Sequence, residues 1–111
     1  MHNEIPKEIT KFYHCTIRKN MRGIFENAIK KGADGVIYLA DSPSNAAKFL
    51  YVRGYPLREI VVFEIAREML DESRLDYSYD HSESFFGCKA YMYQGDIEHG
   101  HIENMYEFPN E

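Results

Sequence analysis

The sequence predicts an α+β domain with a split, antiparallel-rich β-sheet core and two helices in its N-terminal half. The first observation is the order of the segments, which runs strand, helix, strand, helix, strand, long loop, strand, strand. The second is the length of 111 residues, which is close to that of one domain. The third is that no repeat or low-complexity tract divides the chain. We therefore expect a flexible arm over residues 1–10 and a single domain over residues 11–111.

The first strand and the first helix are expected directly after this arm. Residues 11–16 (KFYHCT) have the aromatic and β-branched character of a strand. Apolar residues then recur at helical spacing from residue 18, and Lys30, Lys31 and Gly32 form a typical helix end. The pattern predicts a helix over residues 18–31, with Thr16 as its N-cap.

A second strand and a second helix are expected next, followed by a central strand. Residues 36–40 (VIYLA) form a short β-rich run. Ser42 and Pro43 then combine a capping side chain with a proline in the first turn, which predicts a helix start. Residues 58–65 are almost continuously apolar, so they should form a central strand that is covered on both faces.

The C-terminal third is expected to contribute a long loop and two strands. Residues 66–87 are polar and weakly periodic, and they are interpreted as a loop long enough to carry function. Residues 88–93 alternate in the manner of a strand, and residues 102–108 form the last expected strand.

Composition excludes several classes of protein. Apolar residues make up 44% and charged residues 28%, as in ordinary globular domains rather than disordered chains. Two cysteines and the absence of an apolar N-terminal segment predict a cytoplasmic protein without a membrane span. The formal charge of −5 disfavours nucleic acid as a partner. His99 and His101 lack a third ligand at a defined spacing, so we expect no metal.

Two short motifs carry a resemblance to a known family. The strand end Tyr13-His14-Cys15-Thr16 and the strand-to-helix segment from Tyr38 to Phe49 resemble the NAD-binding core of the ADP-ribosyltransferases, including poly-ADP-ribose polymerases and RNA 2′-phosphotransferases. Their order and spacing agree with that family. The resemblance implies an ADP-ribosyltransferase-like fold and NAD, or an ADP-ribose derivative, as the substrate.

The resemblance also implies roles for individual residues. His14 would bond a ribose hydroxyl of NAD, and the backbone at Cys15 would pair with the nicotinamide amide. Thr16 would be a second polar contact near the ribose. Tyr38 would stack on the nicotinamide ring, and Phe49 would cover its other face. Ser42, at the helix start, completes the expected cofactor-binding set.

The catalytic carboxylate of the family has no direct counterpart in residues 88–93, where Lys89 occupies the comparable position. Glu83 lies just before that strand and is the expected replacement, so the catalytic set is His14, Tyr38 and Glu83. In the alternative interpretation, Lys89 pairs with an anionic group, as cations do in the 2′-phosphotransferases.

The expected function is transfer of ADP-ribose from NAD to a protein or small-molecule acceptor. Two alternatives stay open at this point. One is a catalytically inactive module of the same fold that binds a nucleotide or a protein. The other is an RNA 2′-phosphotransferase-like enzyme, which the acidity and the dispersed arginines of the chain disfavour.

Overall fold

The computed structural model describes residues 5–78 and 90–108. In chain order the helices and strands are β1 (Lys11–Ile17), α1 (Met21–Glu26), β2 (Ala28–Ile29), β3 (Val36–Leu39), α2 (Pro43–Tyr51), β4 (Ile60–Ala66), β5 (Leu75–Tyr77), β6 (Tyr91–Gln94), β7 (Ile97–Glu98) and β8 (Ile102–Glu107). These elements confirm an α+β fold with two α-helices in the N-terminal half. Within the described part of the chain, no helix is long and apolar enough to cross a membrane.

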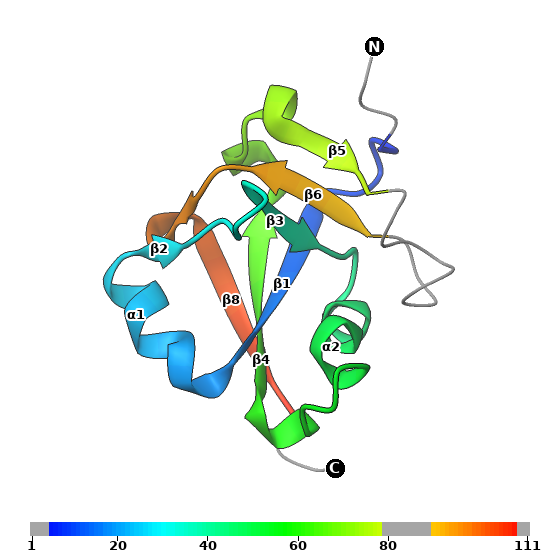
Figure 1. The fold of residues 1–111 in the computed structure, drawn as a ribbon. Coiled ribbons are helices and arrows are strands. Elements are labelled where there is room, and N and C mark those ends of the chain that lie inside the picture. Colours follow the sequence, from blue (N-terminus) through cyan, green and yellow to red (C-terminus); the bar gives the residue numbers. More distant parts are fainter. Residues whose placement is uncertain (1–4, 79–89, 109–111) are drawn as a thin grey trace.

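The strands form three small antiparallel sheets with the orders β1-β4-β8, β3-β6-β5 and β2-β7 (Figure 1). Strand β4 is the centre of the first sheet, and Cys15 of β1 lies opposite Val62 of β4 in the register. Six of the seven residues of β4 are buried. The expectation that this strand is central and covered on both faces is therefore confirmed.

One backbone bridge joins the first two sheets. Tyr13 and Ala40 exchange N–H to carbonyl hydrogen bonds, each of 2.9 Å, where β1 passes the end of β3. On its other side β1 pairs with β4 over its whole length. Strand β1 is thus the element shared by both sheets, and side chains near Tyr13 lie where the sheets part.

Helix α2 covers the first sheet and begins as the sequence predicts. The Ser42 side chain accepts a hydrogen bond of 3.2 Å from the backbone N–H of Asn45, and Pro43 occupies the first turn. Ala46, Ala47 and Phe49 are buried in a cluster that also contains Val62 of β4. This capping bond removes one unpaired donor from the helix end.

The helix expected over residues 18–31 is wrong in its extent. After a 3₁₀ turn over Arg18–Asn20, α1 covers only Met21–Glu26, and Ala28–Ile29 form β2. Ala28 and Ile29 are buried and pair with β7, so tertiary pairing overrides the helical spacing of the apolar residues. Thr16 lies within β1 and is no N-cap, since the N-cap of α1 is Asn20, whose side chain makes no capping bond.

The loop expected over residues 66–87 is also wrong where the structure describes it. Residues 67–77 form 3₁₀ turns at Arg67–Met69 and Glu72–Arg74 and then strand β5. The buried Leu75 lies opposite Tyr93 of β6, and the Tyr77 ring meets that of Tyr91 edge to face, so two side chains anchor this three-residue strand in an otherwise polar segment. Residues 79–87 of the expected loop, and Cys88 and Lys89 of the next strand, lie outside the described residues.

The described part of the N-terminal arm contacts the domain. Ile5 is 6% exposed and belongs to the larger core cluster. The Arg67 guanidinium donates hydrogen bonds to the carbonyls of Pro6 and Ile9, at 2.8 and 3.0 Å. These contacts hold residues 5–10 against the start of β1.

Candidate functional site

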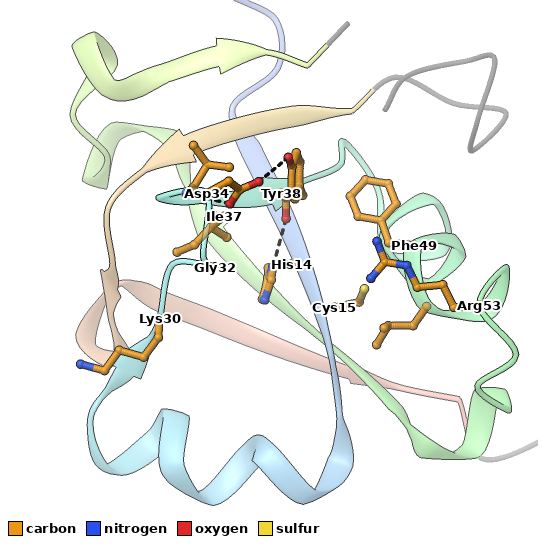
Figure 2. Close-up of a pocket in the computed structure, with 11 residues that line it drawn as sticks. His14, Cys15, Lys30, Gly32, Asp34, Ile37, Tyr38, Phe49 and Arg53 are labelled. Carbon is orange, nitrogen blue, oxygen red and sulfur yellow. Dashed lines mark hydrogen bonds between the residues drawn. The ribbon is translucent and has the colours of Figure 1, made fainter. Parts of the chain in front are cut away.

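His14 lies where the first two sheets part, one residue beyond the Tyr13–Ala40 bridge. Its Nδ1 is 3.0 Å from the backbone carbonyl oxygen of Tyr38 (Figure 2). A carbonyl oxygen can only accept, so Nδ1 carries the proton and donates this bond. In the neutral imidazole, Nε2 is then left as a hydrogen-bond acceptor.

Burial favours this neutral form of His14. Desolvation lowers the pKa of the imidazole below its ordinary value of 6.5, while the bond to the Tyr38 carbonyl acts in the opposite direction. Because the net shift is downward, His14 is neutral at pH 7 and Nε2 can accept a hydrogen bond from a hydroxyl group.

A test follows from the direction of this shift. The unfolded chain takes up a proton at His14 near pH 6.5, whereas the folded protein does so only at lower pH, so acid favours unfolding. We expect the free energy of unfolding to fall as the pH drops from 6.5 through the lowered pKa. Urea denaturation should show a smaller fall for His14→Asn than for the wild-type protein. The same fall in both proteins would contradict the assignment. The charged groups that line the same space, Lys30, Asp34 and Arg53, are unchanged in this comparison.

A cavity of about 220 Å³ opens beside His14. Helix α2 and strands β1 and β3 contribute to its wall, together with the turn that precedes β3 (Figure 2). The lining residues are His14, Cys15, Lys30, Gly32, Asp34, Val36, Ile37, Tyr38, Phe49, Leu50 and Arg53. Four of the residues expected from the sequence, His14, Cys15, Tyr38 and Phe49, are therefore brought together.

Two aromatic side chains form part of the wall. The Tyr38 hydroxyl donates a hydrogen bond of 2.8 Å to Oδ2 of Asp34, which holds the ring against the turn before β3. Phe49 projects from α2 and is 6% exposed. A rigid apolar wall of this kind suits a flat ring as ligand.

The Cys15 thiol lines the cavity as a neutral group. Desolvation raises its pKa to about 12, and backbone hydrogen bonds, followed by the positive charge of Arg53, offset this shift only in part. At neutral pH the side chain is a thiol and not a thiolate, so it contributes surface rather than a nucleophile.

A second cavity, of about 310 Å³, lies on the α1 side of His14. It shares His14 and Lys30 with the first cavity, and Thr16 belongs to it alone. The Thr16 hydroxyl accepts a hydrogen bond of 3.3 Å from Nδ2 of Asn20. The other lining residues are Asn20, Gly23, Ile24, Asn27, Ala28 and Ile29. His14 thus stands between two adjacent hollows.

One of the expected site residues that the structure describes, Ser42, is not among those lining either cavity. The Ser42 hydroxyl is used in capping α2 and is absent from both linings, so its expected role as a ligand contact gains no support from its position. Glu83 lies outside the described residues.

Three charged residues of the site, Lys30, Asp34 and Arg53, are not predicted from the sequence. Arg53 follows Phe49 by four residues, so helical spacing could have placed both on one face. Lys30 was assigned to the end of a longer helix, and Asp34 to a turn. Their shared position depends on the pairing of β2 and on the turn before β3, and no local pattern predicts these. Among the described residues, no group of three or more His, Cys, Asp or Glu side chains is placed to hold a metal ion.

Comparison with known proteins bears on the fold. No family model and no curated protein matches the sequence. Among solved structures, protein CC0527 from Caulobacter crescentus matches with a TM-score of 0.62 and 15% identity, over 88% of this chain and 85% of that one. A double mutant of CC0527 matches with a TM-score of 0.61 and 14% identity, with the same coverage of both chains. At such low identity the likeness shows a shared α+β fold and nothing about function.

Proposed function

We propose that the protein is an NAD-binding, ADP-ribosyltransferase-like enzyme whose site is centred on His14. The observation that carries the proposal is the neutral imidazole of His14, which is held by the Tyr38 carbonyl and lines both cavities. An acceptor in that position suits a ribose hydroxyl, which can donate to it.

The sizes of the two cavities are compatible with a dinucleotide that places a different part in each cavity. Ligand sites commonly measure about 300–1,000 Å³, and the cavity beside Tyr38, at about 220 Å³, is smaller than this. It would hold one end of a dinucleotide, the nicotinamide ring, against the aromatic wall. The second cavity, at about 310 Å³, would take the next part of the ligand, with His14 between the two.

The proposed reaction breaks the glycosidic bond between the ribose C1′ and the nicotinamide nitrogen. The electron pair of that bond stays with the nitrogen, so neutral nicotinamide leaves and an oxocarbenium-like ribose remains. An acceptor nucleophile then bonds C1′ and loses its proton. In this scheme His14 orients the ribose, while Tyr38 and Phe49 orient the leaving ring.

A carboxylate near C1′ would stabilise the developing positive charge. Glu83 keeps this role as a proposal from the family resemblance. Among the described lining residues, Asp34 is the one carboxylate, and its Oδ2 already accepts from the Tyr38 hydroxyl.

Incubation of the purified protein with NAD tests the proposal. We expect a rise in melting temperature with NAD, and nicotinamide release that can be measured by chromatography. Glu83→Gln should lower the release and leave the thermal shift in place. If NAD and ADP-ribose both leave the melting temperature unchanged and no nicotinamide appears, the proposal is wrong.

A nucleotide-binding module without chemistry is the second candidate. It is favoured by the engagement of Asp34, which accepts hydrogen bonds from Tyr38 and from the Val36 backbone and so is already in use. The same incubation separates the two candidates, because a module would show the thermal shift without nicotinamide release.

A further inference from the structure

The cavity beside His14 contains a cation, Arg53, that the proposed reaction does not use. Arg53 comes directly after the C-cap of α2, and its backbone N–H donates to the Leu50 carbonyl at 2.9 Å. Gly54, the next residue, has a φ of +98°, which glycine adopts readily. The backbone on both sides of Arg53 is therefore held, and its side chain extends toward Cys15 and Phe49 (Figure 2).

The other charges around the cavity have partners. Lys30 points away from His14 and lies 3.6 Å from a carboxylate oxygen of Asp96 (Figure 2). Asp34 accepts a hydrogen bond from the Tyr38 hydroxyl. Arg53, by contrast, forms no ion pair with any carboxylate in residues 5–78 and 90–108. Of the two cations that line the cavity, Lys30 is paired with Asp96, whereas Arg53 has no ion-pair partner among the described residues.

We propose that Arg53 binds an oxyanion, a carboxylate or a phosphoryl group, on the end of the ligand that enters this cavity. The inference rests on the proposed function and narrows its substrate. Of two dinucleotides that differ only at the pyridine ring, the one that carries a carboxylate should bind better than NAD, which carries a neutral carboxamide.

Charge and geometry both favour a ring that carries a carboxylate over one that carries a carboxamide. The pyridinium ring of NAD is positive, so a neutral carboxamide would leave two positive charges facing each other across a small cavity. A carboxylate on the ring neutralises that charge and can accept two parallel N–H bonds from a guanidinium. The Cys15 thiol beside it is neutral, so no fixed anion there competes for Arg53.

Small fragments allow a test that does not depend on the whole dinucleotide. Nicotinate and nicotinamide differ only in carboxylate against carboxamide, and either is small enough for the cavity. Their dissociation constants can be measured by ¹H–¹⁵N NMR titration of the wild-type protein, Arg53→Gln and Arg22→Gln. Arg22 is an exposed arginine of α1 that lines neither cavity, so it controls for the loss of one charge.

We expect the wild-type protein and Arg22→Gln to bind nicotinate about tenfold more tightly than nicotinamide. Arg53→Gln should reduce this preference to twofold or less, and Arg53→Lys should leave an intermediate value because lysine cannot form the paired bonds. Inorganic phosphate that displaces nicotinate would show that phosphoryl groups use the same residue. Failure of phosphate to displace it would assign the site to carboxylates.

Equal affinity for the two fragments in the wild-type protein would overturn the inference, as would a preference that survives in Arg53→Gln. Neither outcome depends on NAD. If NAD releases nicotinamide but the two fragments bind equally well, only the inference about Arg53 is wrong. If nicotinate is preferred but the protein shows no response to NAD, only the proposed function is wrong.

Discussion

His14→Asn is expected to weaken NAD binding about tenfold while leaving the fold intact. The amide nitrogen of asparagine can take the place of Nδ1 and donate to the Tyr38 carbonyl, which is 3.0 Å from Nδ1 in the wild-type protein. The acceptor at Nε2 is lost, however, and one hydrogen bond to a ligand hydroxyl contributes about 1–1.5 kcal/mol. Isothermal titration with NAD measures the loss, and thermal unfolding checks the fold.

His99→Asn is the matched control for this variant. His99 is exposed, and its Nδ1 lies 3.2 Å from the Asn27 carbonyl, so the substitution has the same local chemistry at a position that lines neither cavity. NAD affinity should remain within about twofold of the wild-type value. Similar losses in both variants, or none in His14→Asn, would remove His14 from the site.

Phe63→Ala should lower the free energy of unfolding by about 3–5 kcal/mol, as is usual for a fully buried phenylalanine. Phe63 lies in the centre of β4, is 0% exposed and is paired with residues of both β1 and β8. Small domains have a total of about 5–15 kcal/mol, so one side chain accounts for a large share of the stability. Urea denaturation measures the change directly.

Phe25→Ala provides the comparison. The Phe25 ring meets that of Phe63 edge to face, with 5.6 Å between ring centroids, but it is 44% exposed. Truncation there removes the same ring contact and much less buried surface, so we expect a loss of about 1 kcal/mol. Equal losses in the two variants would mean that the ring contact, and not burial in the sheet, stabilises this region.

Local patterns predicted the parts of the fold that local chemistry decides. Helix α2 begins where Ser42 can cap it, and β4 is central because nearly every residue in it is apolar. The end of α1 was wrong because Ala28 and Ile29 have helical spacing yet pair with a strand about seventy residues later in the chain. Strand β5 was not predicted because it is three residues long and Leu75 is its only fully buried residue.

In the candidate site, too, the residues placed by local patterns were predicted and those placed by long-range pairing were not. His14, Tyr38 and Phe49 come from elements that were placed correctly, and they line one cavity. Lys30 and Asp34 reach it through the connection between β2 and β3, whose path follows from long-range pairing. The spacing of Arg53 to Phe49 could have predicted that both residues lie on one face. That Arg53 has no ion-pair partner among the described residues follows only from the structure.

At the candidate site, the position of the two sheets and the choice of ligand depend on different parts of the chain. Main-chain atoms decide where the two sheets part, and the bond from His14 to the Tyr38 carbonyl also ends on a main-chain atom. The side chain of Arg53, which is exposed, takes no part in these bonds. Substitutions at Arg53 can therefore change which ligand is accepted while the two sheets keep their positions, whereas substitutions at the buried Phe49 would also remove core packing.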